Sequence, residues 1–192
     1  MTATREEIDA LLHRANAALQ LWLLLCSDLA IRSGTAVRLS PQHYDQQRAE
    51  LRFVTKANAH MTLPVTTEIK RILDQCDQNS DETFIRQLWN TGKGHQGAHI
   101  KKGCDGIDAL RWQFHKLCKE VGITRRITAH DLRRTTAVAM LEQTREIRDV
   151  QAVLGHRSLQ STIWYLDHDL RPVKRSTLEL IKRPAWRKEQ IA

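Results

Sequence analysis

A histidine and an arginine stand three residues apart in the segment Thr128-Ala129-His130-Asp131-Leu132-Arg133. Thr128 and Asp131 have the spacing of a capping box, which predicts that a helix begins here. His130 and Arg133 then share a face of its first turns, where free amides and the helix dipole favour an anion. An isolated pair of this kind is also compatible with an ordinary solvated helix start. If the two side chains converge, they would form a phosphate site.

A second group of polar residues follows, with Leu154-Gly155-His156 and then Tyr165 nine positions after the histidine. The glycine is predicted to end one helix and to turn His156 back toward the helix that carries His130. Tyr165 falls on a further short helix, and only Tyr44 competes with it as a phenol in this chain. A phenol has a pKa of about 10 in isolation, so it needs a base or a positive field to attack at neutral pH.

These motifs, in this order and at this spacing, resemble the signature of the tyrosine recombinase or phage-integrase family. The family pattern includes an earlier arginine in a segment that often reads Gly-Leu-Arg-x-x-Glu, and Leu29-Ala30-Ile31-Arg32 fits it with Arg32 at that position. It also includes a lysine in a β-hairpin between the two arginines, which Lys56 matches. The resemblance covers nearly the whole chain and implies the fold of the family's catalytic domain.

The resemblance implies a site-specific recombinase or integrase that cleaves and rejoins duplex DNA through a 3′-phosphotyrosine at Tyr165. Arg32, Arg133 and His156 would bind the non-bridging oxygens and stabilise the transition state. Lys56 would protonate the leaving 5′ oxygen, and His130 would accept the tyrosine proton. The phosphodiester energy is conserved in this scheme, so we expect no metal, ATP or other cofactor.

The sequence departs from the family pattern at two positions beside this set. Thr35 stands where many members have an acidic residue that supports the first arginine, and Arg134 stands where a histidine is common. Members also have an N-terminal helical core-binding domain that clamps DNA. This chain begins where the catalytic domain would, so we expect one catalytic domain over residues 1–192 without that clamp. By the same resemblance, residues 171–192 would dock on a neighbouring protomer, giving tetramers on paired DNA sites and a monomer without DNA.

The remaining pattern predicts a mainly α fold with a small antiparallel β-sheet (α+β). Apolar residues recur at helical spacing from residue 8 to about 26, after a capping box formed by Thr4 and Glu7. Alternation over residues 49–65 predicts a β-hairpin. Further helices are expected over residues 66–76, 107–120, 128–143, 145–154 and 161–166, and a glycine-rich loop over 91–106.

The formal net charge of +8 at pH 7 favours polyanionic partners, of which DNA or RNA is the commonest. The four cysteines are widely spaced and do not form a disulfide framework, which indicates a protein of the reducing cytoplasm. We expect it to be a bacterial or phage-encoded protein associated with the nucleoid. The N-terminus lacks a signal pattern, and the longest apolar stretch is too short to cross a bilayer.

Three other functions remain open from the sequence. His95, His99 and Cys104 could supply three zinc ligands, but no fourth stands at zinc-finger spacing. A regulatory DNA-binding module would keep the fold without catalysis, although all the expected catalytic residue types are present. A type IB topoisomerase would share the chemistry and would relax supercoiled DNA without a specific site.

Overall fold

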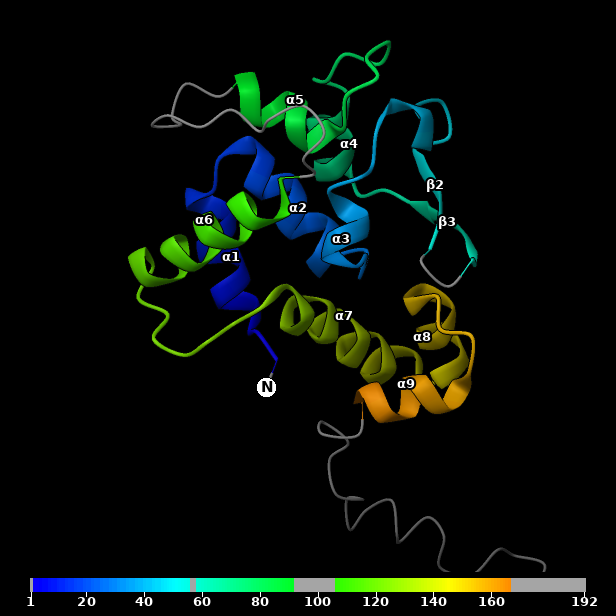
Figure 1. Ribbon diagram of the computed structural model, residues 1–192. Coiled ribbons are helices and arrows are strands. Elements are labelled where there is room, and N and C mark those ends of the chain that lie inside the picture. Colours follow the sequence, from blue (N-terminus) through cyan, green and yellow to red (C-terminus); the bar gives the residue numbers. More distant parts are fainter. Residues whose placement is uncertain (1, 56–57, 92–105, 167–192) are drawn as a thin grey trace, which may run out of the picture.

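The computed structural model describes residues 2–55, 58–91 and 106–166. Over these ranges the chain is mainly helical, with one three-stranded antiparallel sheet (Figure 1). The predicted mainly α fold with a small antiparallel sheet is therefore confirmed. The elements occur in the order α1 Arg5–Arg14, α2 Ala17–Ser27, α3 Ser33–Ala36, the 3-10 helix η1 Pro41–His43, β1 Tyr44–Asp45, β2 Glu50–Val54, β3 His60–Pro64, α4 Thr67–Leu73, α5 Phe84–Thr91, α6 Ile107–Glu120, α7 Ala129–Thr144, α8 Ile147–Leu154 and α9 Leu159–Leu166.

Two helices occupy the stretch in which the sequence predicts one helix over residues 8–26. The capping box of Thr4 and Glu7 starts α1 as expected, but the chain becomes extended at Ala15 and Asn16. The Asn16 side chain accepts a hydrogen bond from the Leu19 amide and so caps α2. The single long helix was wrong because an uninterrupted apolar period hides a cap that turns the chain between two helices.

Helix α2 forms the centre of the larger hydrophobic core, and its residues from Leu21 to Ser27 are all buried. It packs against α7 and α5, and also contacts α4 and α6. The Trp22 ring meets Phe114 of α6 edge to face, with the ring centroids 5.5 Å apart. The chain that leaves this buried helix carries Arg32, so the position of Arg32 is set by the core.

The predicted hairpin of residues 49–65 is confirmed as β2 and β3. Leu51 pairs with Leu63 and Phe53 with Met61, and burial alternates along β2 as the period-two pattern requires. A short strand, β1, adds to the other edge of β2 through the pairing of Tyr44 with Leu51. The sequence did not predict β1, because two residues are too few to show a period.

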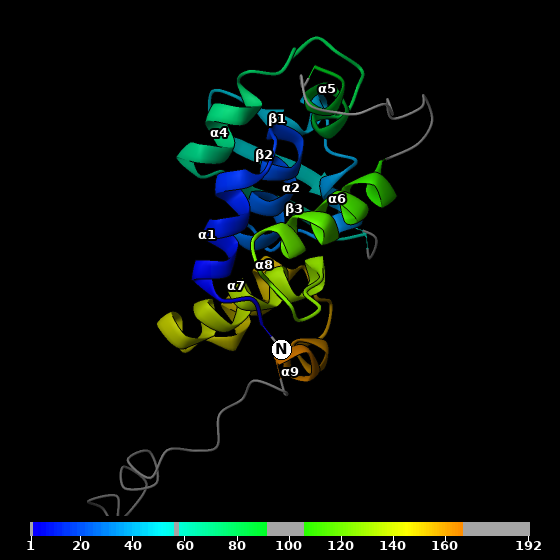
Figure 2. The ribbon, with the colours of Figure 1, turned by 90° about the vertical axis from the view of Figure 1, so that its left-hand side faces the viewer.

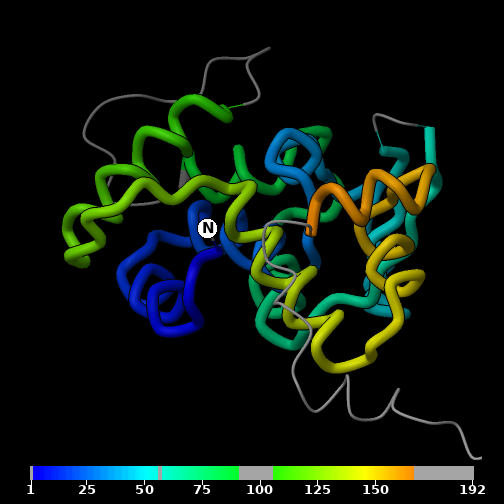
Figure 3. The backbone as a smooth tube through the Cα atoms, turned by 90° about the horizontal axis from the view of Figure 1, so that it is seen from below, coloured from blue at the N-terminus to red at the C-terminus, as the bar shows by residue number. Residues whose placement is uncertain are grey.

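A second, smaller core joins α7, α8 and α9, in the lower part of Figure 1. Thr128 and Asp131 form the predicted capping box of α7, and Gly155 ends α8 at a φ of 58°, as its glycine suggested. Helix α9 begins two residues before the predicted start. Figure 2 shows α7, α8 and α9 grouped below α1 and α6, and Figure 3 shows the same group from below, coloured yellow-green to orange.

Cys26, Cys76 and Cys118 are buried free thiols, consistent with the prediction that the cysteines form no disulfide framework. No helix within the described ranges is long and apolar enough to span a membrane. The predicted loop at 91–106 lies almost wholly outside the described residues, as do Cys104 and the segment 171–192.

Candidate active site

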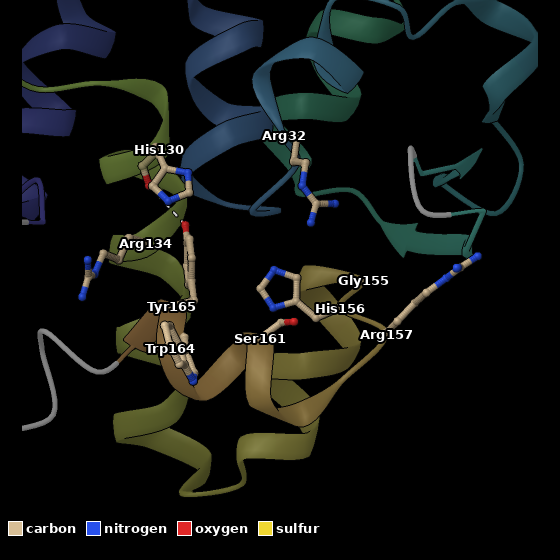
Figure 4. Close-up of a pocket in the computed structure, with 9 residues that line it drawn as sticks. All are labelled: Arg32, His130, Arg134, Gly155, His156, Arg157, Ser161, Trp164 and Tyr165. Carbon is tan, nitrogen blue, oxygen red and sulfur yellow. Dashed lines mark hydrogen bonds between the residues drawn. The ribbon is translucent and has the colours of Figure 1, made fainter.

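Four of the six predicted site residues line one open cavity of about 580 Å³ (Figure 4). Each comes from a different segment of the chain. Arg32 follows the buried helix α2, His130 lies in the first turn of α7, His156 follows α8, and Tyr165 lies on α9. The four residues selected by motif spacing are therefore brought together by the fold.

Arg133, the fifth predicted residue, is not among the residues that line this cavity, but it links the segments around it. The residue is 4% exposed, and its guanidinium donates one hydrogen bond to the Leu154 carbonyl at 2.6 Å and another to the Ala30 carbonyl. These two carbonyls lie two residues before His156 and two residues before Arg32. Arg133 thus fixes the backbone immediately upstream of both residues.

Burial, followed by the nearby charge of Arg32, lowers the pKa of Arg133 to about 10. The guanidinium therefore stays protonated at neutral pH. The backbone it binds at Ala30 has a φ of 50°, in the left-handed region that favours glycine. The glycine common at this place in the family segment would adopt that conformation without strain.

His156 is held by a buried hydroxyl. Its Nδ1 lies 3.1 Å from Oγ1 of Thr162, a residue of α9 that is fully buried. Burial and then the charge of Arg133 lower the pKa of His156 to about 4, so the ring is neutral at pH 7. When the threonine hydroxyl donates to Nδ1, Nε2 carries the proton and can donate it to an anion in the cavity.

His130 is also neutral at pH 7, because burial and then the charge of Arg133 lower its pKa below the usual value. Its ring meets the Tyr165 ring edge to face, with the centroids 4.8 Å apart. A neutral imidazole beside a phenol is a competent proton acceptor. The position therefore suits the predicted role of a base.

Tyr165 is half-buried, and its hydroxyl donates a hydrogen bond to the backbone carbonyl of His130 at 3.2 Å. Its ring stands between His156 on one side and Arg134 on the other, as Figure 4 shows. Burial raises the pKa of Tyr165 to about 12, while the charges of Arg133 and Arg134 oppose that rise. Without DNA the phenol is therefore protonated and bonded to the protein.

The hairpin reaches this site at the turn that precedes His156. A methyl group placed on Gly155 would lie 3.2 Å from Met61 Sδ and 3.3 Å from Thr55 Cγ2. The hairpin residue Thr55 is thus close to the site. Lys56, the sixth predicted residue, follows it in the sequence and lies outside the described residues.

The cavity has further lining residues that the sequence analysis did not assign to the site. The Cζ atom of Arg134 lies 6.0 Å from the centre of the Tyr165 ring, and Trp164 is 73% exposed at the rim. Arg157 and Ser161 also line the cavity, and Arg157 lies on the opposite side from Arg134 (Figure 4). Arg134 was seen only as a departure from the family pattern, although its place directly after Arg133 on a helix was a usable signal. No comparable pattern marked Trp164.

A metal site is not visible in the part of the chain that the structure describes, where no three His, Cys, Asp or Glu side chains converge. The zinc ligands considered from the sequence, His95, His99 and Cys104, all lie outside that part.

The profile described as "Phage integrase family" matches residues 2–171. The chain belongs to the phage integrase family. One curated relative, tyrosine recombinase XerC of Shewanella sp. (strain W3-18-1), is 28% identical over 169 residues, which cover 86% of this chain and 52% of the relative. The chain thus spans about half the length of this relative.

Several solved structures have the same fold as this chain. The XerH site-specific recombinase has a TM-score of 0.67 and 17% identity, covering 94% of this chain and 52% of its own. The catalytic domain of bacteriophage HP1 integrase has a TM-score of 0.61 and 18% identity, covering 98% of both chains. The described fold therefore corresponds to the catalytic domain of a phage integrase.

Proposed function

We propose that this protein is a site-specific recombinase that cleaves one DNA strand through a covalent bond to Tyr165 and then rejoins it. The observation that carries the proposal is the composition of the cavity around the phenol. Its lining includes Arg32, Arg134, Arg157 and two neutral histidines, and none of the lining residues that the structure describes is acidic. A cavity of this kind suits a phosphodiester next to a nucleophile.

The scissile phosphate would bind between Arg32 and His156. A guanidinium donates in a fork that matches two phosphate oxygens, and a neutral imidazole adds one more donor. Arg133 contributes a nearby positive charge and holds both residues in place through the Ala30 and Leu154 carbonyls. Arginine charge takes the role that metal ions have in many phosphoryl-transfer enzymes, so the proposal requires no divalent cation.

Activation of Tyr165 requires its hydroxyl to leave the His130 carbonyl and turn toward phosphorus. The proton then passes to the neutral His130 ring, and the phenolic oxygen forms the new bond to the 3′ phosphate. The bond to the 5′ oxygen breaks, and that oxygen takes a proton from Lys56. Rejoining reverses these transfers with a 5′ hydroxyl as nucleophile. Bond energy is conserved, so neither ATP nor another cofactor is consumed.

Duplex DNA is the partner that this chemistry implies. The XerH structures were solved with the difH DNA substrate in pre-cleavage and post-cleavage complexes, which supports DNA as the substrate here. We extend the proposal to assembly: a monomer without DNA and four protomers on paired sites, with residues 171–192 docking in trans. Deleting residues after Arg171 should then abolish DNA-dependent oligomers in light scattering while sparing binding to a single site. Unchanged assembly would contradict the trans role.

The test of this function is covalent capture. The protein is incubated in EDTA with a pool of nicked duplexes whose central segment is randomised, then denatured, and the captured DNA is sequenced. We expect a denaturation-resistant adduct in the natural chain and in Tyr44→Phe, none in Tyr165→Phe, and a consensus in the captured DNA. No adduct would favour a regulatory module, and an adduct without consensus would favour a type IB topoisomerase.

A further inference from the structure

A second cavity, of about 270 Å³, adjoins the first. The two share Arg32 and His130 in their walls, so they lie next to one another. Ser33, Thr35 and Arg38 contribute to the second cavity but not to the first. None of the roles proposed above uses these three residues.

The second cavity is strongly cationic. Three arginines line it, Arg32, Arg38 and Arg133, and none of the lining residues that the structure describes is acidic. Thr35 is neutral and buried, whereas the acidic residue common at this position in the family would place a carboxylate in this wall. The balance of charge therefore favours an anion here.

Arg38 is placed to bind such an anion. Its neighbours Val37 and Leu39 are buried in the main core, and its amide donates to the Thr35 carbonyl at 3.0 Å, so its backbone is fixed. Its side chain is exposed, and no ion pair joins it to a carboxylate of the described residues. An anchored backbone with an exposed guanidinium loses little freedom when a phosphate arrives.

We propose that the second cavity binds a DNA phosphate adjacent to the scissile one on the cleaved strand, with Arg38 as its main ligand. This inference rests on the proposed function. Successive phosphates of one strand follow one another at every nucleotide, so a strand whose scissile phosphate lies in the first cavity brings a neighbouring phosphate toward the adjoining one. Arg32 would then lie between two phosphates and set which bond reaches Tyr165.

The test combines a protein change with a DNA change. A duplex sequence identified in the covalent-capture experiment is made as a series. Each member of the series has a single neutral methylphosphonate, at a different position flanking the cleavage site. Binding is measured in the Tyr165→Phe background, so that covalent capture does not contribute. Arg38→Gln is compared with Arg71→Gln, which removes an exposed arginine of α4 that lines neither cavity.

We expect Arg38→Gln to weaken binding about tenfold and to lower the slope of log affinity against log salt by about 0.9. A methylphosphonate at one flanking position should weaken binding to the parent protein similarly. That substitution should cost nothing further in Arg38→Gln, but its full effect should remain in Arg71→Gln.

Equal losses in Arg38→Gln and the parent protein at every flanking position would overturn the second phosphate site. The proposed function would still stand in that case, because adduct formation by the natural chain is measured separately. Conversely, absence of an adduct at Tyr165 would overturn the proposed function regardless of how Arg38 behaves.

Discussion

The two sides of the cavity are held in very different ways. On one side Arg133 is buried and bonded to two backbone carbonyls, from segments 103 and 21 residues away in the sequence. On the other side Tyr165 is half-buried, and its hydroxyl donates a 3.2 Å hydrogen bond to the His130 carbonyl. The cationic side is part of the folded core, whereas the nucleophile rests on a short helix beside it.

This difference separates stability from reactivity. Residues of the cationic side should affect both folding and catalysis, because the same hydrogen bonds that hold the chain also place the charges. The phenol should affect catalysis alone, since a long bond to a carbonyl that water can replace contributes little to folding. A nucleophile that must exchange its partner for a phosphate also benefits from a weak initial bond.

The largest effect is expected at Arg133. Arg133→Ala leaves two buried carbonyls without their donor and should lower the free energy of unfolding by about 3 kcal/mol. Arg133→Lys keeps a charge but cannot make the fork, so it should fold better yet cleave at least about 100-fold more slowly. Chemical denaturation and adduct formation measure the two effects. If Arg133→Ala were as stable as Tyr165→Phe, the contrast between the two sides would be lost.

A substitution at Gly155 tests how closely the hairpin packs against the turn that precedes His156. Gly155→Ala should lower the free energy of unfolding by about 2 kcal/mol, because φ is 58° and the new methyl meets Met61 and Thr55. Gly122→Ala is the matched control, with a φ of 82° and no atom within 4 Å of the added methyl. It should show the backbone cost alone, about 1 kcal/mol. Equal losses in the two variants would mean that the hairpin contact does not resist the methyl group.

Thr162 connects the nucleophile's helix to the phosphate-binding residues. It lies on α9, as Tyr165 does, and its hydroxyl contacts His156. Thr162→Val keeps the shape and removes the hydroxyl, so His156 should lose its fixed tautomer and cleavage should slow about tenfold. Thr162→Ser keeps the hydroxyl and should retain most of the rate. A single-turnover assay at saturating DNA separates this loss from weaker binding. Equal rates in the valine and serine variants would show that the hydroxyl does not orient His156.

The last of these effects is a dependence of stability on pH. The pKa of His156 is about 4 in the folded chain and about 6.5 when unfolded, so the unfolded state binds the proton more readily. Stability from this residue is therefore complete above pH 6.5 and is lost as the pH falls toward 4. His156→Gln should flatten the pH dependence of unfolding in this window. An unchanged profile would mean that His156 is not neutral in the folded state.

The sequence predicted local features well. Capping boxes at Thr4 and Thr128 and the alternation around Leu51 depend on neighbouring residues, and the structure confirms each of them. The family spacing also predicted that Arg32 and Tyr165 would meet, and they share a cavity. Their catalytic roles stay predictions.

Long-range features were not predictable in this way. The bonds of Arg133 to Ala30 and Leu154 depend on how distant segments pack, and so do the contacts of Arg134 and Trp164 with the cavity. No local rule specifies these contacts between distant segments, because they arise only when the core has formed. Helix α5 was also not predicted from the sequence.

The central claim is that Tyr165 is the nucleophile, and peptide mapping of the DNA adduct tests it most directly. The adduct is digested with protease and nuclease, and the nucleotide-linked peptide is sequenced by mass spectrometry. The account predicts a 3′-linked nucleotide on Tyr165 and a free 5′ hydroxyl on the released strand. A nucleotide on Tyr44, a buried residue whose hydroxyl donates to Asp74, or on any serine would contradict it.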